Sequence, residues 1–159
     1  MSSTVQMIDA YLAGVQTLRQ AIAGMSREQL LKKPVPGKWS TQEVVCHLGD
    51  SEQAWVHRMK RVIAEDRPLY LGYNETRFTA TLPYHEMDVE EEVNLFEQLR
   101  RQMAGILRRL PPEAWRRDGV HNERGLLTLE QMVQVETDHV THHVKFILEK
   151  RRALGLPAQ

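Results

Sequence analysis

The sequence has a single cysteine, Cys46, and its 21 acidic residues balance its 21 basic residues. One cysteine excludes the internal disulfide framework of small secreted proteins, so a cytoplasmic location is expected. The charge balance leaves no positive excess to attract nucleic acid or an anionic membrane surface. The N-terminus lacks the basic and then apolar pattern of a signal peptide, and no apolar run approaches the roughly 20 residues that span a bilayer. We therefore expect neither a nucleic-acid nor a membrane partner.

What the sequence does contain is helical periodicity. Its 159 residues, 42% of them hydrophobic, suit one globular domain over 1–159 with a sizeable core. In four stretches apolar residues recur every three or four positions, which is typical of amphipathic helices. Capping pairs mark three of the starts, for example Ser40 with Glu43. The predicted helices span 4–24, 40–66, 88–110 and 128–152.

These four helices predict an all-α four-helix bundle, because no strand-like alternation and no internal repeat competes. The connection 67–87 is long for a bundle link. It indicates a crossover, in which the third long helix runs in the same direction as the second. The same segment is a candidate cover for a site. A second loop precedes the last helix.

The last helix carries polar residues on its apolar face. Glu136, His139 and His143 share that face with valines and other apolar side chains. Polar groups in a core need partners, and two imidazoles one helical turn apart can reach a single metal ion. The sequence therefore predicts a metal site here, with a third ligand from another helix.

His47 is the natural third ligand, because it lies on the inner face of the second long helix. If the two helices are antiparallel it lies near His143, and if they are parallel it lies near Glu136 or His139; both arrangements are compatible with shared ligation. Three imidazoles leave a coordination position open on Zn²⁺, Ni²⁺, Fe²⁺ or Mn²⁺. Such a metal lowers the pKa of bound water toward about 7, polarises a carbonyl or binds a thiolate.

Two carboxylates are candidate catalytic residues. Glu136 is a candidate base or further ligand, although pairing with an inward arginine is an equal alternative. Asp50, one turn after His47, is a candidate for orienting an imidazole N–H. His142 is expected to flank the site at the surface, and His121 to be solvent-exposed in a loop.

Two runs of residues resemble one known family. The first is PGKWSTQEVVCHLGDSE at 36–52, and the second extends from His121 to His143. Both are similar to motifs of the DinB-like (YfiT-like) superfamily of metal-dependent hydrolases. Phe146 stands where some relatives carry a further histidine, a difference that changes the pocket wall.

The resemblance implies a four-helix bundle with a long crossover, and it implies His47, His139 and His143 as the metal ligands. It also implies a homodimer, and an enzyme that is either a hydrolase or an S-transferase using a low-molecular-weight thiol. The predicted function is therefore a metal-dependent enzyme acting on a small molecule. The alternatives are a non-catalytic metal- or ligand-binding stress-response protein and a purely structural bundle whose histidines bond to one another.

Overall fold

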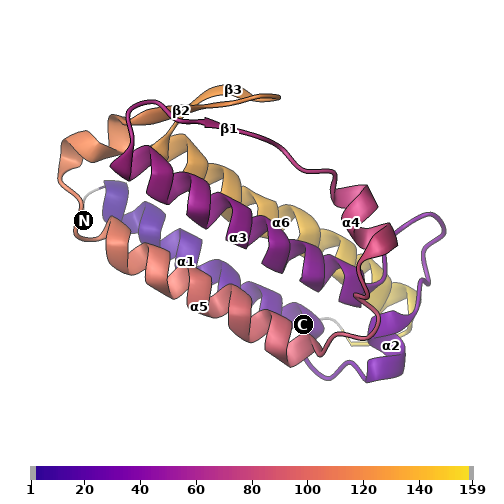
Figure 1. Cartoon of the computed structure of the whole chain (residues 1–159). Coiled ribbons are helices and arrows are strands. Elements are labelled where there is room, and N and C mark those ends of the chain that lie inside the picture. Colours follow the sequence, from indigo (N-terminus) through magenta and orange to yellow (C-terminus); the bar gives the residue numbers. More distant parts are fainter. Residues whose placement is uncertain (1–2, 158–159) are drawn as a thin grey trace.

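The structure is a computed structural model that describes residues 3–157. Four long helices form a bundle, which confirms the predicted all-α fold (Figure 1). They are α1 (Ser3–Ile22), α3 (Thr41–Ala64), α5 (Val89–Leu107) and α6 (Leu129–Ala153). Among the described residues no helix is both long enough and apolar enough to cross a membrane.

The helices start where the sequence placed their caps. Ser40 accepts a hydrogen bond from the backbone N–H of Glu43, whose side chain accepts one from the backbone N–H of Ser40. Thr128 and Gln131 form the same capping box at the start of α6. These bonds satisfy backbone groups that a helix end leaves free. The short α2 (Arg27–Leu31) is capped by Ser26 in the same way.

The long helices do not alternate in direction along the chain. Figure 1 shows α3 and α5 running one way and α1 and α6 running the other. Within the bundle α1 packs against α5 and α6, and α3 packs against the same two helices. The segment after α3 must therefore return along the whole bundle before α5 begins, which confirms the predicted crossover.

A small sheet that the sequence did not predict lies at one end of the bundle, with β1 (Leu69–Tyr70), β2 (Asp118–His121) and β3 (Gly125–Thr128) in that order. β1 pairs in parallel with β2, and β2 pairs antiparallel with β3. The strands are too short to show alternation, and the first pairing joins segments about fifty residues apart. Two further short helices, α4 (Glu75–Thr81) and η1 (Pro112–Arg116), lie in the two predicted loops.

A buried ionic network divides the apolar core into two clusters. One cluster contains Trp55, Met103 and Val133, and the other contains Leu48, Phe96 and Val140. Between the two clusters, α3, α5 and α6 each carry a buried polar residue, and these are Glu52, Arg100 and Glu136 respectively. The bundle interior is therefore not purely apolar at its middle level.

Candidate metal centre

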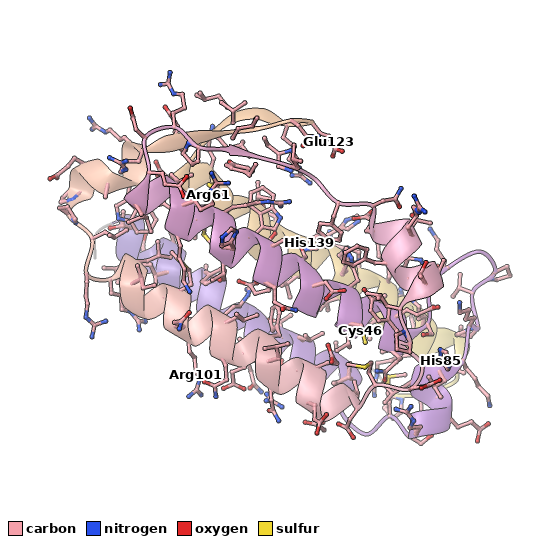
Figure 2. All side chains as sticks on the ribbon, in the orientation of Figure 1. Cys46, Arg61, His85, Arg101, Glu123 and His139 are labelled. Atoms are coloured by element: carbon pink, nitrogen blue, oxygen red, sulfur yellow. The ribbon has the colours of Figure 1, made fainter. Side chains whose placement is uncertain are left out.

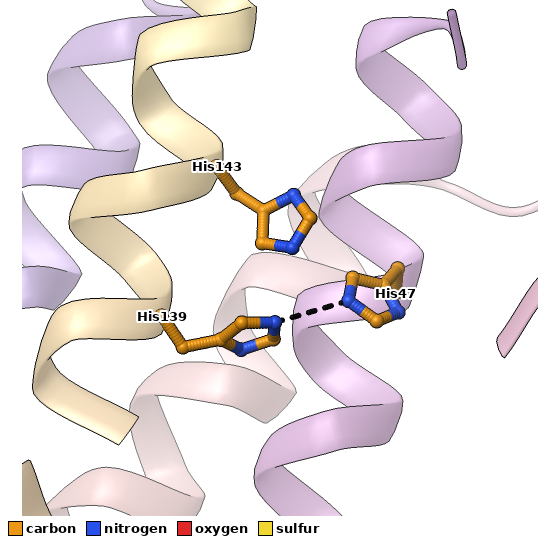
Figure 3. A group of neighbouring side chains, drawn as sticks. All are labelled: His47, His139 and His143. Carbon is orange, nitrogen blue, oxygen red and sulfur yellow. Dashed lines mark hydrogen bonds between the residues drawn. The ribbon is translucent and has the colours of Figure 1, made fainter. Parts of the chain in front are cut away.

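Three histidines meet between α3 and α6. His47 comes from the first third of α3, and His139 and His143 come from successive turns of α6 (Figure 3). The Nε2 atoms of His47 and His139 are 3.1 Å apart. One ligand atom from each of the three rings lies within 4.8 Å of the other two. Because α3 and α6 run antiparallel, the first of the two predicted arrangements is the one that occurs.

Burial keeps these imidazoles neutral. It is the main cause that lowers the pKa of His139 to about 2 and that of His143 to about 3, and neighbouring imidazoles lower both further. Burial also lowers the pKa of His47. Near neutral pH all three rings therefore offer lone pairs in place of extra protons, and neutral imidazole is the form that binds a metal.

The hydrogen bonding of the centre is incomplete in a way that fits a metal. The Nδ1 atoms of His139 and His143 are buried and have no hydrogen-bond partner among residues 3–157. A hydrogen bond between the Nε2 atoms of His47 and His139 joins only these two rings and does not include the ring of His143. A cation in contact with all three rings accounts for their convergence, and an all-imidazole set suits a late divalent transition metal.

Trp39 forms one wall of the centre. Its ring lies 5.1 Å from that of His47 and is stacked at 6.4 Å on that of His143. The ring thereby anchors the loop before α3 directly on two of the three histidines. The wall limits access of water from that side.

Asp50 lies one turn beyond His47, but its hydrogen bond goes elsewhere. Its carboxylate accepts the hydroxyl of Tyr84, a residue of the crossover segment. Against the lowering effect of burial, the negative charges of Glu75 and then of Asp50 raise the pKa of His47. The structure thus places Asp50 beside the centre as a charge, and its predicted role in orienting an imidazole stays a prediction.

Glu136 lies beneath the centre with its carboxyl group fully buried. Its Oε1 atom is 4.0 Å from Nδ1 of His139 and has no hydrogen-bond partner in the described part of the chain. Burial, followed by the charge of Glu52, raises its pKa well above the usual range. Within residues 3–157 this carboxyl group forms no ion pair with an arginine: Arg100 binds the carboxylate of Glu52 at 2.8 Å and only the backbone oxygen of Glu136.

A cavity of about 350 Å³ opens beside His139 and Glu136. Arg58 and Arg124 lie over the ring of Trp55, with guanidinium carbons 4.9 and 5.6 Å from its centre. Acidic side chains also line the cavity, so it carries both signs of charge. The sequence did not predict this cavity wall of Trp55 and two arginines. Its one signal in the sequence is that Trp55 and Arg58 are three residues apart on one helix and can therefore contact each other.

The predicted exposure of His121 is wrong. It is 4% exposed, and its ring is stacked at 6.0 Å on that of Trp55, in the wall of the same cavity. Its Nδ1 accepts the backbone N–H groups of Glu123 and Arg124. The β2–β3 hairpin, which the sequence did not reveal, carries it inward. His142 is exposed at the cavity edge, as predicted, and its ring contacts that of His143.

Comparison of the sequence with known proteins identifies one family. The profile described as "DinB superfamily" matches residues 10–147. "Putative metal-dependent hydrolase YfiT" of Bacillus subtilis is 27% identical over 139 residues, covering 87% of this chain and 78% of the relative. "Putative metal-dependent hydrolase OB0782" of Oceanobacillus iheyensis is 27% identical over 130 residues, covering 82% and 75%.

Solved structures show the same fold. Bacillus subtilis YfiT, described as "a probable metal-dependent hydrolase with an unusual four-helix bundle topology", superposes with a TM-score of 0.91 at 25% identity. That match covers 99% of this chain and 91% of the other. A mycothiol-dependent maleylpyruvate isomerase superposes with a TM-score of 0.72 at 10% identity. It is matched over 60% of its length and 91% of this chain, a likeness of fold alone.

Proposed function

Because this chain belongs to the DinB superfamily, we propose that it is a metal-dependent enzyme for a small-molecule substrate, with His47, His139 and His143 as the metal ligands. The observation that carries the proposal is the convergence of three neutral imidazoles, His47 buried and His139 and His143 partly buried, with ligand atoms within 4.8 Å of one another. A bound divalent ion, Zn²⁺, Ni²⁺, Fe²⁺ or Mn²⁺, would supply Lewis acidity that activates water, as in a hydrolase, or a low-molecular-weight thiol, as in an S-transferase.

Residues of the chain supply the remaining functions. Glu136 holds a proton at a carboxyl group that borders the cavity, because burial disfavours its ionised form. It is therefore suited to donating a proton to a leaving group, a role that differs from the base considered from sequence alone. Asp50 contributes negative charge near His47 and thereby favours a bound cation. The cavity of about 350 Å³ fits a small polar substrate.

Water is the preferred co-substrate because the relatives of known name are described as metal-dependent hydrolases. The thiol alternative is supported by less: the isomerase is thiol-dependent by its name and shares only the fold. A homodimer, implied by the family resemblance, is part of the proposal and is testable by light scattering.

The test begins with metal content. Wild-type protein purified without tag or chelator is expected to bind about one transition-metal ion per chain, and a His139→Ala, His143→Ala double variant none. His142→Ala is the matched control, because His142 is exposed on the same helix and should leave the metal in place. Wild-type protein that takes up none of the four ions on reconstitution would contradict the proposal.

A substrate screen then separates an enzyme from a binding protein. Esters, amides and lactones are tested with and without an added thiol, using loaded and metal-free protein. Turnover that requires the metal and is lost in the double variant supports the enzyme. Stoichiometric metal with no turnover in either arm would favour the non-catalytic metal-binding alternative.

A further inference from the structure

A second cavity, of about 180 Å³, shares His143 with the metal centre. None of its lining residues borders the larger cavity. Its walls come mainly from the loop before α3 and from the C-terminal part of α6. The side chains that matter for its chemistry are Lys38, Trp39, His143, Phe146 and Lys150.

A tight turn places the loop against α6. The backbone N–H of Lys38 donates to the carbonyl of Val35 at 3.2 Å, with Pro36 and Gly37 between them. Gly37 has φ of +72°, the conformation that the third position of a type II turn requires. The turn sets Trp39 on His143 and brings Nζ of Lys38 to 5.1 Å from the ring centre of Phe146.

Lys150 is a buried cation without an anionic partner. Its side chain is 2% exposed, and its Nζ donates to the backbone oxygen of Phe146 at 3.1 Å. An ammonium group has three donors, so two are left for a ligand. No carboxylate of the described chain lies within ion-pair distance of this nitrogen, although burying an unpaired charge is costly.

Two other buried cations of the bundle, Arg100 and Arg151, are more fully engaged. Arg100 is paired with Glu52, and Arg151 donates to the backbone oxygens of Ala21, Ala23 and Pro157. These bonds lie within the fold and leave no cavity to fill. Lys150 differs from both because its free donors border an open space.

The surroundings of Lys150 favour an added negative charge. A second cation, Lys38, faces the same Phe146 ring, and its charge together with burial lowers the pKa of Lys150. The carboxylates that act on Lys150 belong to Glu43 and Glu149, and neither lines the cavity. Glu43 is already bonded to Lys33. An anion between the two ammonium groups would offset their mutual repulsion.

We propose that this cavity is an anion subsite, in which Lys150 and Lys38 bind a carboxylate or phosphate group of the substrate. Phe146 and Trp39 would contact the apolar part next to that group, and His143 marks the side that leads to the metal centre. The inference rests on the proposed function, since it assigns part of the substrate of the same enzyme. It predicts an acidic substrate and disfavours neutral ones.

The test uses metal-free protein in a low-chloride buffer, so that it does not depend on the metal. The indole N–H signals of the three tryptophans are followed by two-dimensional ¹⁵N NMR, and a Trp39→Phe variant assigns the signal of Trp39. Three probes are titrated: butyrate, inorganic phosphate and the neutral butyramide. We expect saturable shifts of the Trp39 signal with at least one anion and none with butyramide. The tighter anion identifies the group that the subsite selects.

Variants then locate the charge. Lys150→Met should weaken binding of the preferred anion by about tenfold or more, because hydrogen bonds to charged groups contribute about 1.5–3 kcal/mol. Lys38→Met, at an exposed position where folding is not at risk, should also weaken it. Lys145→Met is the control, since Lys145 is exposed on the same helix and does not line the cavity.

Two results would overturn the subsite: equal shifts with butyrate and butyramide, or anion binding that both lysine variants leave unchanged. The second is expected if Lys150 serves only the carbonyl groups at the C-terminal end of α6. Metal uptake is measured separately, on portions of the same preparations that are reconstituted with the four ions. Absence of metal uptake with anion binding present contradicts the proposed function alone, and metal uptake without anion binding contradicts this inference alone.

Discussion

The bundle holds two buried polar clusters, and they differ in how far their hydrogen bonds are completed. The ionic cluster consists of Tyr11, Glu52 and Arg100, and the histidine cluster consists of His47, His139 and His143. The ionic cluster joins α1, α3 and α5, and the histidine cluster joins α3 and α6. The comparison separates polar groups that stabilise the fold from polar groups that await a ligand.

In the ionic cluster every group meets a partner. The carboxylate of Glu52 accepts Nε of Arg100 with one oxygen and the hydroxyl of Tyr11 with the other. The remaining nitrogens of Arg100 donate to the backbone oxygens of Tyr11 and Glu136. Gly14 leaves room for the guanidinium group, since an added Cβ would collide with it. A cluster completed in this way has no donor or acceptor left for chemistry.

In the histidine cluster buried atoms stay unpaired within the described chain. These are the Nδ1 atoms of His139 and His143, with Oε1 of Glu136 next to them (Figure 2 places His139 within the bundle). A folded protein leaves few such atoms, and each calls for an explanation. This difference indicates that a functional site can be recognised by the buried polar atoms that the fold leaves without hydrogen-bond partners.

The largest effect is expected from breaking the completed cluster. Arg100→Met leaves the carboxylate of Glu52 buried and unpaired, which should lower the free energy of unfolding by about 3–5 kcal/mol in urea denaturation. Arg101→Met is the matched control, because that side chain is 66% exposed and points away from the bundle (Figure 2). The control should stay within about 0.5 kcal/mol of wild type. An Arg100→Met protein as stable as wild type would remove the distinction between the two clusters.

Removing the metal should have a smaller effect. A ligand at 100 times its dissociation constant stabilises the folded state by about 2.7 kcal/mol, so chelation should lower the melting temperature of loaded wild-type protein. The His139→Ala, His143→Ala variant should not respond to the chelator. A melting temperature of loaded wild-type protein that is unaffected by chelation would show that the histidine cluster needs no ligand for its stability.

The smallest effect is a dependence on pH in the metal-free protein. His143 has a pKa of about 3 in the folded state, against the ordinary imidazole value of 6.5, so below pH 6.5 the unfolded chain binds a proton that the folded protein excludes. Its contribution is complete above pH 6.5 and is lost as the pH falls toward 3. Between pH 6 and pH 5 the free energy of unfolding of wild type should fall by about 1.4 kcal/mol more than that of His143→Asn.

Parallel slopes for the two proteins would contradict this prediction. The comparison with the variant is necessary because Glu136 acts in the opposite sense. The pKa of Glu136 is higher in the folded protein than in the unfolded chain. At a pH between these two pKa values the folded protein keeps a proton that the unfolded chain has released, so the free energy of unfolding falls as the pH rises through this interval. Subtracting the variant removes this contribution.

Much of the fold and of the centre is predictable from local patterns. The helices follow from period and caps, and the resemblance to the DinB-like family is confirmed by the match to residues 10–147. The convergence of His47 with His139 and His143 follows because buried imidazoles on two helix faces need shared partners. The direction of α3 relative to α6 does not follow, since both directions satisfied the same pattern.

The features that sequence reasoning missed depend on contacts between distant segments. His121 is buried because a hairpin of four-residue strands pairs with a strand about fifty residues earlier, and such short strands carry no alternation. Arg100 selects Glu52 over Glu136 because of where three helices cross. From the sequence alone, Lys150 is an ordinary cation in the last turn of α6. Only the structure shows that Lys38, in the loop before α3, lies near the same Phe146 ring as Lys150.

The sequence by itself thus determined the four helices and the crossover, because each depends on spacing within one segment, and it identified the three histidines as polar residues on the apolar faces of two helices. Only the tertiary structure decided which carboxylate pairs with Arg100, that His121 lines the larger cavity, and that Lys38 and Lys150 both lie near the ring of Phe146. Those outcomes depend on packing between segments far apart in the chain, and periodicity within one helix carries no information about it.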